Sequence, residues 1–285
     1  GGGSSNTNGQ LFTVFDISGM TTVDFRGQRE NTGFKNGNVA AAVGIGTAEL
    51  SSTTSNNLRG INITGGSIST NSGALTMTGA GTALTGGSDH DAIRTTGATI
   101  SSGTGAVLLD GTNNVVRSGS AINASGAADV TIRSSDFVNV TANITSTGGS
   151  VVLHSDSDSS GDGRVEVTSQ ISSNGGDITI GGGADPATGA AVSTSTIGVL
   201  LDGGDLDAGG GNISMRGSST ADWGIRTVNG VTIETTGAGT ISLVGDSTGG
   251  GSSDGISLGT GSGSTLIRSQ NGKITLDGSS TARYG

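Results

Sequence analysis

The chain has 285 residues, of which 56 are Gly and none is Cys, and Asp and Glu outnumber Lys and Arg by 23 to 13. The resulting net charge of −10 argues against a nucleic-acid partner, because the chain would repel phosphates. The lack of Cys excludes disulfides, thiol catalysis and thiolate metal sites, and no apolar run of about 18 residues is present to predict a membrane-spanning helix.

Residues 1–60 fit the pattern of the rest of the chain least well. A first strand motif begins near Val23, and residues 31–59 predict either a long excursion or an extra irregular turn. Most of the Phe residues also lie here, and we interpret them as core filling. We therefore treat residues 1–60 as the irregular start of the same solenoid and residues 61–285 as its regular part.

From residue 61 onward, a short motif recurs in which two apolar residues flank a third, mostly small polar one. Alternation with a period of two residues is typical of a strand with one face turned inward. The motif begins at Leu75, Val107, Val130, Val151, Ile178, Ile213, Ile241 and Ile274.

Two further apolar columns precede these strands. The nearer column stands seven or eight residues before each strand, at Ile68, Ile100, Ile122, Ile144, Ile171, Leu206, Ile233 and Ile267. The farther column is expected another seven residues earlier, at Ile61, Ile93, Val115, Phe137 and Val199.

Steps of seven are also typical of coiled coils. Gly costs about 1 kcal/mol per helical position, and each step contains Gly or a run of Ser, Thr or Asn, so a continuous helix is disfavoured. The sequence instead predicts an all-β fold, a parallel β-helix solenoid with three faces per turn and about nine rungs. Crossover statistics favour a right-handed coil.

Successive strand motifs begin 21 to 35 residues apart, although the two corner spacings are nearly constant. The additional residues must therefore follow the first strand of each turn. They fall in segments 79–90, 154–163, 181–196, 216–223 and 245–254, which we name the loop edge. In a coil these segments emerge along one side, where solenoids commonly bind their ligands.

The C-terminal residues 278–285 repeat the pattern of residues 217–224, and no polar cap is evident. Solenoids need caps that stop end-to-end pairing. We therefore expect either a segment of a longer repetitive protein or a chain whose neighbour is another copy of itself, end to end.

One segment of the loop edge resembles the first half of a calcium-binding loop. Asp156, Asp158 and Ser160 place oxygens at positions one, three and five, Gly161 occupies position six, and Asp162 follows. Calcium prefers about six to eight oxygen ligands. The acidic residue expected at position twelve is missing, so the segment is either a calcium site or a solvated acidic loop.

Two other groups are candidate ligand-binding residues. Asp89, His90 and Asp91 form either a metal or acid–base cluster or an ordinary polar loop. Trp223 beside Asp222 suits carbohydrate stacking, and packing at a corner is the alternative.

Catalytic patterns are weak, and no enzyme is expected. Residues 251–255 match the nucleophile pattern G-x-S-x-G formally but lack a strand-to-helix elbow. Asp202, Asp205 and Asp207 would serve as a glycosidase pair only beside a sugar-holding surface, and few aromatic residues lie near them.

The stretches 175–183 (GGDITIGGG), 209–219 (GGGNISMRGSS), 237–245 (GAGTISLVG) and 271–280 (NGKITLDGSS) resemble repeats of large secreted bacterial β-helical adhesins. The nearest family is that of filamentous haemagglutinin and biofilm-matrix exoproteins, and the likeness covers residues 61–285. The resemblance implies a secreted, cell-surface rod that contacts cells, surfaces or polysaccharides, and it supplies no catalytic residues. The family's repeats are shorter and more regular than those of this chain.

These observations together predict an extracellular structural or adhesive rod whose partner is a polysaccharide or a cell-surface receptor, bound through the loop edge. One alternative is the repeat unit of a self-assembling extracellular filament. A second alternative is a polysaccharide-degrading β-helix enzyme, which needs converging carboxylates and basic residues.

Overall fold

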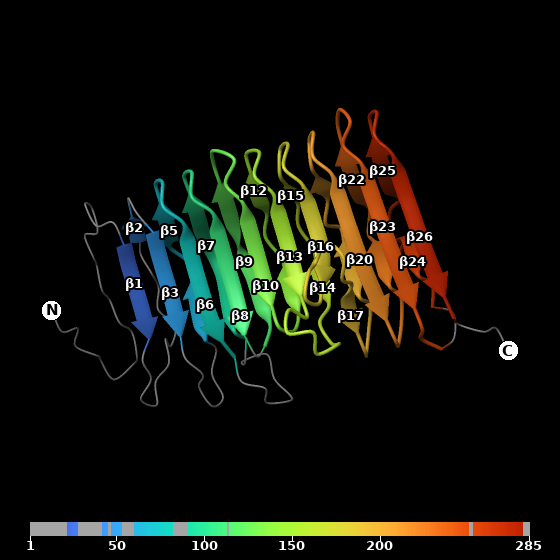
Figure 1. Cartoon of the computed structure of the whole chain (residues 1–285), viewed down its shortest axis with the longest axis horizontal. Coiled ribbons are helices and arrows are strands. Elements are labelled where there is room, and N and C mark those ends of the chain that lie inside the picture. Colours follow the sequence, from blue (N-terminus) through green and yellow to red (C-terminus); the bar gives the residue numbers. More distant parts are fainter. Residues whose placement is uncertain are drawn as a thin grey trace.

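The structure is a computed structural model. It describes residues 22–27, 42–44, 47–52, 60–81, 91–112, 114–250 and 253–281, with side chains described from residue 60 onward. The regular structure of these ranges is entirely β-strand, without a helix, and every strand pair within the sheets is parallel. Figure 1 shows the strands stacked side by side along the long axis of the molecule.

Sheet A contains 11 strands in the order β1-β3-β6-β8-β10-β13-β16-β20-β23-β26, with β17 paired beside β20. Its strands follow one another in chain order, because each turn of the chain adds one strand to the end of the sheet. The bounds are β1 (Thr22–Gly27), β3 (Thr47–Ser52), β6 (Leu75–Ala80), β8 (Val107–Thr112), β10 (Val130–Ser134), β13 (Val151–Ser155), β16 (Ile178–Gly182), β17 (Ala191–Ser193), β20 (Ile213–Ser219), β23 (Ile241–Ser247) and β26 (Ile274–Ser280).

Sheet B contains 15 strands in two rows, which join where β7 and β9 run across both. The first row holds β4 (Ile61–Thr64), β11 (Val138–Val140), β14 (Val165–Val167), β18 (Val199–Asp202), β21 (Ile225–Val228) and β24 (Ile256–Thr260). The second row holds β2 (Ala42–Gly44), β5 (Ser67–Thr70), β12 (Ile144–Ser146), β15 (Ile171–Ser172), β19 (Leu206–Asp207), β22 (Val231–Thr235) and β25 (Thr265–Ser269). The shared strands are β7 (Ile93–Ser102) and β9 (Val116–Ala124). From β3 onward, the chain passes through both rows before it forms the next strand on the main path of sheet A.

The apolar core consists of columns of side chains that stack from turn to turn. The predicted strand starts in sheet A pair in register, and those from Leu75 to Ile241 are at most 1% exposed. The second predicted column, from Ile68 to Ile267, is likewise in register throughout. Both columns are confirmed. Parallel strands stack identical positions, so one apolar position per strand suffices to build a continuous core.

The third predicted column is wrong at Val115 and Phe137. The buried residue that pairs with Ile93 is instead Val116, and Val138 pairs with Val116 in turn; each stands one residue later than predicted and is 0% exposed. Val116 stands six residues before Ile122 of the second column, whereas Ile93 stands seven before Ile100. The difference arises because β7 has one extra residue between Thr96 and Thr99, where its register with β9 shifts. A one-residue offset exchanges the two faces of a strand, so Phe137 lies outside the column.

The interval 31–59 contributes β2 and β3, one to each sheet. This arrangement favours the extra irregular turn over the long excursion. In β3, Ala48 pairs with Leu75, at a position where every later strand of sheet A has Val, Leu or Ile. The weak apolar character of Ala explains why the strand motif did not reveal β3.

The longer connections follow the strands of sheet A, as predicted. Figure 1 shows these strands pointing the same way, with the connections from their ends along the lower edge and short turns along the upper edge. Segments 156–164, 183–190, 194–198, 220–224, 248–250 and 253–255 all belong to this loop edge. Most of the first predicted segment, 82–90, lies outside the described residues, as do residues 251 and 252.

Buried hydroxyl groups bind the loop edge to the stack. Ser193, Ser219 and Ser247 are in register at the ends of their strands and are at most 2% exposed. The Ser219 hydroxyl accepts hydrogen bonds from the backbone N–H groups of Ala221 (3.1 Å) and Asp222 (2.8 Å) and donates one to the Thr196 carbonyl of the preceding turn. The Ser219 hydroxyl therefore holds the loop of the turn before it.

The corner that leads into sheet A has a column of Gly residues. These residues stand two positions before successive strands, at Gly149, Gly176, Gly211, Gly239 and Gly272. A Cβ atom on Gly211 would lie 2.0 Å from the Gly176 carbonyl oxygen of the preceding turn. The backbones of neighbouring turns approach too closely here for any side chain.

Candidate functional site

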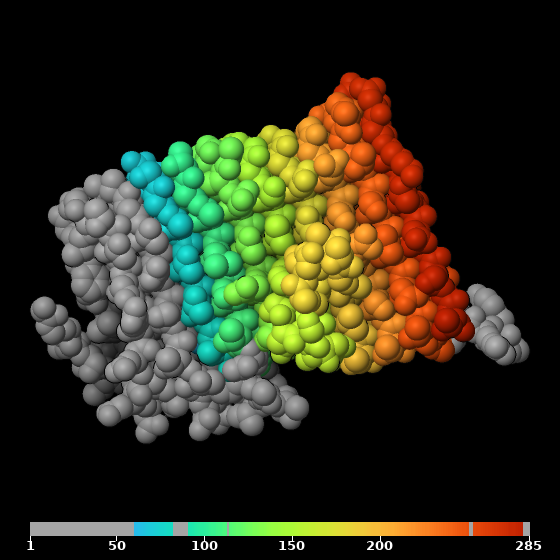
Figure 2. Space-filling view, viewed as in Figure 1, coloured from blue at the N-terminus to red at the C-terminus, as the bar shows by residue number. Residues whose placement is uncertain are grey.

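A cleft of about 310 Å³ lies at the loop edge. Segments from successive turns form it, each just before a strand of the first row of sheet B. The residues that determine its chemistry are Asp136, Phe137, Asp162, Arg164, Ser195 and Thr196. Figure 2 shows the yellow-green and yellow surfaces of the loop edge protruding beside each other. The Gly163 N–H joins these two segments by donating to the Val192 carbonyl at 2.6 Å.

Phe137 forms an apolar wall of the cleft and is only 8% exposed. The guanidinium carbon atoms of Arg164 and Arg117 lie 4.3 Å and 5.7 Å from the centroid of its ring. Both cations therefore pack on the aromatic ring, in the geometry of cation–π contacts. A planar ligand cannot stack freely on Phe137, so the polar groups of the cleft must carry recognition.

Both arginines already have acidic partners. Arg164 donates to the Glu166 carboxylate at 3.1 Å and to the Thr196 hydroxyl at 3.0 Å, and Arg117 donates to Asp91 at 2.9 Å. These bonds fix the guanidinium planes, which is a property that distinguishes Arg from Lys. The positive charges of the cleft are thus matched by carboxylates that do not line it.

Asp136 is the most perturbed acid of the site. Burial raises the pKa of its carboxyl group, the negative charges of Asp162 and Asp158 raise it further, and Arg117 and Arg164 oppose the shift. No hydrogen bond reaches this carboxylate within the described part of the chain. The other acid, Asp162, accepts one hydrogen bond from the Thr194 N–H at 3.2 Å.

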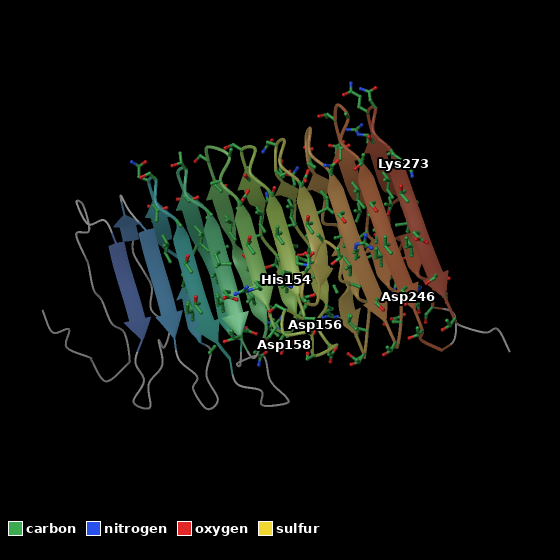
Figure 3. All side chains as sticks on the ribbon, in the orientation of Figure 1. His154, Asp156, Asp158, Asp246 and Lys273 are labelled. Atoms are coloured by element: carbon green, nitrogen blue, oxygen red, sulfur yellow. The ribbon has the colours of Figure 1, made fainter. Side chains whose placement is uncertain are left out.

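The predicted calcium loop follows β13, and Figure 3 shows His154 on that strand with Asp156 and Asp158 nearer the lower edge. Asp156 is 3% exposed, and its Oδ1 accepts hydrogen bonds from the Ser160 hydroxyl (3.1 Å) and the Gly161 N–H (2.9 Å). Asp158 accepts one from the Ser160 N–H (3.2 Å). The loop is therefore closed by its own side chains.

Among the described residues, no three side chains of His, Cys, Asp or Glu come together in a group that could hold a metal ion. The structure thus brings Asp156 and Ser160 into contact but does not gather the carboxylates of Asp156, Asp158 and Asp162 into one such group. Calcium binding by this segment stays a prediction.

Trp223 lies at the loop edge beside Asp222, outside the cleft. The Arg226 guanidinium lies 3.9 Å from the centroid of its ring, and burial raises the pKa of the Asp222 carboxyl group while Arg226 opposes the shift. Trp223 keeps part of its surface exposed. The structure thus shows corner packing on Arg226, and carbohydrate binding by Trp223 stays a prediction.

Of the third candidate group, Asp89 and His90 lie outside the described residues. Asp91 is 2% exposed and forms ion pairs with Arg117 (2.9 Å) and Arg94 (3.8 Å). Asp91 thereby orients Arg117, which in turn packs on the Phe137 wall of the cleft.

Asp202, Asp205 and Asp207, among which a glycosidase pair was considered, accept hydrogen bonds that hold neighbouring segments together. Asp205 accepts a hydrogen bond from the Thr232 N–H (2.6 Å), Asp207 accepts one from the Gly209 N–H (2.8 Å), and Asp202 accepts one from the Asn229 amide (2.6 Å). Each carboxylate satisfies a polar group of its own or the following turn, as expected of a structural side chain.

Sequence reasoning missed Asp136, Phe137 and Arg164 as site residues. The seven-residue spacing before Ile144 predicts a core position for Phe137 instead of a site position. The useful signal was present: Phe137 is the one Phe outside the first 60 residues, it follows an acid directly, and it lies in a corner. An acid directly before an isolated aromatic residue is the sequence signal that marks this position as a candidate site.

Comparisons with protein-family models, with curated proteins and with solved structures found no match to the chain. The part of the chain that the structure describes holds no helix that would span a membrane.

Proposed function

We propose that the chain is an extracellular structural and adhesive rod of a large bacterial surface or matrix protein, folded as a right-handed parallel β-helix with three strands per turn. The alternation of sheet A with the two rows of sheet B supports this architecture. The loop edge contacts other cells, surfaces or polysaccharides, and the function includes no catalytic step.

The observation that carries the proposal is the cleft of about 310 Å³ formed by successive turns at the loop edge. The stacked columns hold the backbone in place, whereas the connections at this edge vary in length from turn to turn. Solenoids commonly use such edges for recognition, since changes there leave the stack undisturbed. The acidic, Cys-free composition suits an exposed and well-hydrated rod.

A polysaccharide panel tests the proposal. The chain is expected to be retained on a subset of immobilised neutral, acidic and amino polysaccharides without generating new reducing ends or unsaturated products. The variant Ser195→Trp, which places a large side chain at an exposed position of the cleft, should keep its β circular dichroism spectrum and lose retention. Turnover would favour the degrading enzyme, and failure to retain any polysaccharide or any cell would contradict adhesion.

One observation favours self-assembly as a second candidate function. The exposed large apolar residues of the described chain are Leu258, Leu266, Ile274 and Leu276, all on β24, β25 and β26. Ile274 and Leu276 continue columns in which Ile241 and Leu243 are buried. One further turn, from the same chain or from a second copy, would cover them.

Analytical ultracentrifugation over a range of concentrations tests this second candidate. Self-association should increase with concentration and should be abolished by Leu276→Lys. The matched change Thr275→Lys alters the opposite face of the same strand and should leave association unchanged. A chain that stays monomeric at all concentrations would contradict the filament.

A further inference from the structure

The cleft presents carboxylates that lack a cationic partner. Within the described part of the chain, no ion pair involves Asp136 or Asp162, and the nearby arginines are held by Glu166 and Asp91. The whole chain carries a net charge of −10, which adds to the negative potential of the cleft. An anionic ligand is disfavoured, and a positively charged group would relieve the repulsion among these acids.

The size of the cleft selects an organic cation over a metal ion. Calcium requires about six to eight oxygen ligands at short distance, and no group of three acidic or His side chains in the described ranges could hold a metal. A volume of about 310 Å³ is at the lower end of the range typical of small-ligand pockets. It accommodates a group of the size of one sugar ring.

Hydroxyl groups complete the lining. Ser195 is exposed at the cleft, and its hydroxyl makes no hydrogen bond within the described residues. The Thr196 hydroxyl is already engaged by Arg164 and Ser193. Ser195 and the free carboxylate oxygens thus offer hydrogen bonds to a ligand that has both an ammonium group and neighbouring hydroxyls.

We propose that the cleft between Asp136 and Asp162 binds the protonated amine of an unacetylated amino-sugar residue in a polysaccharide. This inference rests on the proposed adhesive function and names the ligand class of the same edge. The ammonium group lies between the two carboxylates, and the sugar hydroxyls face Ser195.

Three β-1,4-linked tetrasaccharides that differ at the second carbon of each ring provide the test. They are the tetramer of glucosamine, which carries an ammonium group, the tetramer of N-acetylglucosamine and cellotetraose. Isothermal titration calorimetry at pH 6 and low salt should show the glucosamine tetramer binding about tenfold or more tightly than the other two. Added salt should weaken this binding, because the contact is between charges.

Isosteric variants locate the contact. Asp136→Asn and Asp162→Asn should each weaken binding of the glucosamine tetramer by about tenfold, since each removes a charged acceptor. Asp254→Asn is the matched control. Asp136 stands two residues before Val138, and Asp254 stands two residues before Ile256 in the same column of paired strands. Asp254 lies outside the cleft. Its binding should be unchanged, and circular dichroism verifies that all variants fold.

Equal binding of the three tetrasaccharides, or undiminished binding by the Asp136→Asn and Asp162→Asn variants, would overturn the inference. A rise in melting temperature on addition of calcium that is lost in the Asp136→Asn variant would also overturn the inference, in favour of a metal site. Retention of the chain on neutral or acidic polysaccharides without any binding of the glucosamine tetramer would reject the amine and leave the adhesive function standing. Failure to retain any polysaccharide would reject both.

Discussion

Arg133 on β10 and Asp110 on β8 are register partners on the outer face of sheet A and form a bidentate ion pair. The Arg133 Nε and Nη2 atoms lie 2.8 Å and 2.5 Å from the two Asp110 carboxylate oxygens. This hydrogen bonding, opposed by partial burial, raises the pKa of the Arg133 guanidinium further above its ordinary value. The contact joins neighbouring turns through side chains in addition to the backbone ladder.

A double-mutant cycle with Arg133→Gln and Asp110→Asn should give a coupling energy of about 0.5–1 kcal/mol in urea unfolding at low salt. The value is modest because the Arg133 side chain is 45% exposed and water screens the pair. Raising the salt concentration should reduce it. A coupling energy of zero, or one that salt leaves unchanged, would show that the pair contributes no electrostatic stability.

Ser219→Ala should destabilise the chain by about 1–3 kcal/mol, because two backbone N–H groups at the corner lose their acceptor and the Thr196 carbonyl loses its donor. The urea midpoint measures the change. Ser218→Ala is the control, since the Ser218 side chain is on the outward face and makes no hydrogen bond within the described residues. Equal effects of the two substitutions would contradict a role for the buried hydroxyl column.

Gly211→Ala should be among the most disruptive single substitutions, with a marked fall in melting temperature, because the added Cβ would lie 2.0 Å from the Gly176 carbonyl oxygen. Its neighbour Gly210 has no atom within 4 Å of an added Cβ, so Gly210→Ala should be tolerated. Differential scanning calorimetry compares them directly. A Gly211→Ala chain with unchanged melting would mean that adjacent turns are farther apart than the structure shows.

Asp136 should make stability depend on pH. Its pKa in the folded chain is raised above the ordinary value of 3.8, so between these two values the folded state keeps a proton that the unfolded chain releases. The contribution of Asp136 to stability therefore decreases as the pH rises through this window. Asp136→Asn should melt at a higher temperature than the parent chain at pH 7.

This difference should vanish below about pH 3, where Asp136 is protonated in both states. Asp254→Asn removes a carboxylate at the corresponding position outside the cleft and serves as the control. An Asp136→Asn variant that is no more stable than the parent chain at pH 7 would show that the carboxylate is not under electrostatic strain.

The strands and two of the three core columns could be predicted from sequence because parallel stacking places the same kind of residue at the same position in every turn. Ile178, for example, pairs with Ile213, and the alternation around each is visible locally. The third column failed at Phe137 because a corner one residue shorter changes which residue points inward. The spacing of apolar residues along the sequence does not by itself reveal that a corner is one residue shorter.

The cleft was less predictable. The loop edge was located from the lengths of the turns, and Asp162 lies in a predicted segment. The contact between Arg164 and Phe137 depends on residues 27 positions apart that meet only when their turns stack in register. Within the described residues Asp136 forms no ion pair, because Arg117 and Arg164 pair with Asp91 and Glu166, and these pairings arise only when the turns stack.

The backbone hydrogen bonds of sheets A and B run along the long axis of the molecule, from one turn to the next. A pulling force applied along that axis would load these bonds one turn at a time instead of shearing many strands together. A tether built in this way would lengthen as single turns unfold one after another at nearly constant force. Such a tether would dissipate mechanical shock while its remaining turns stayed intact.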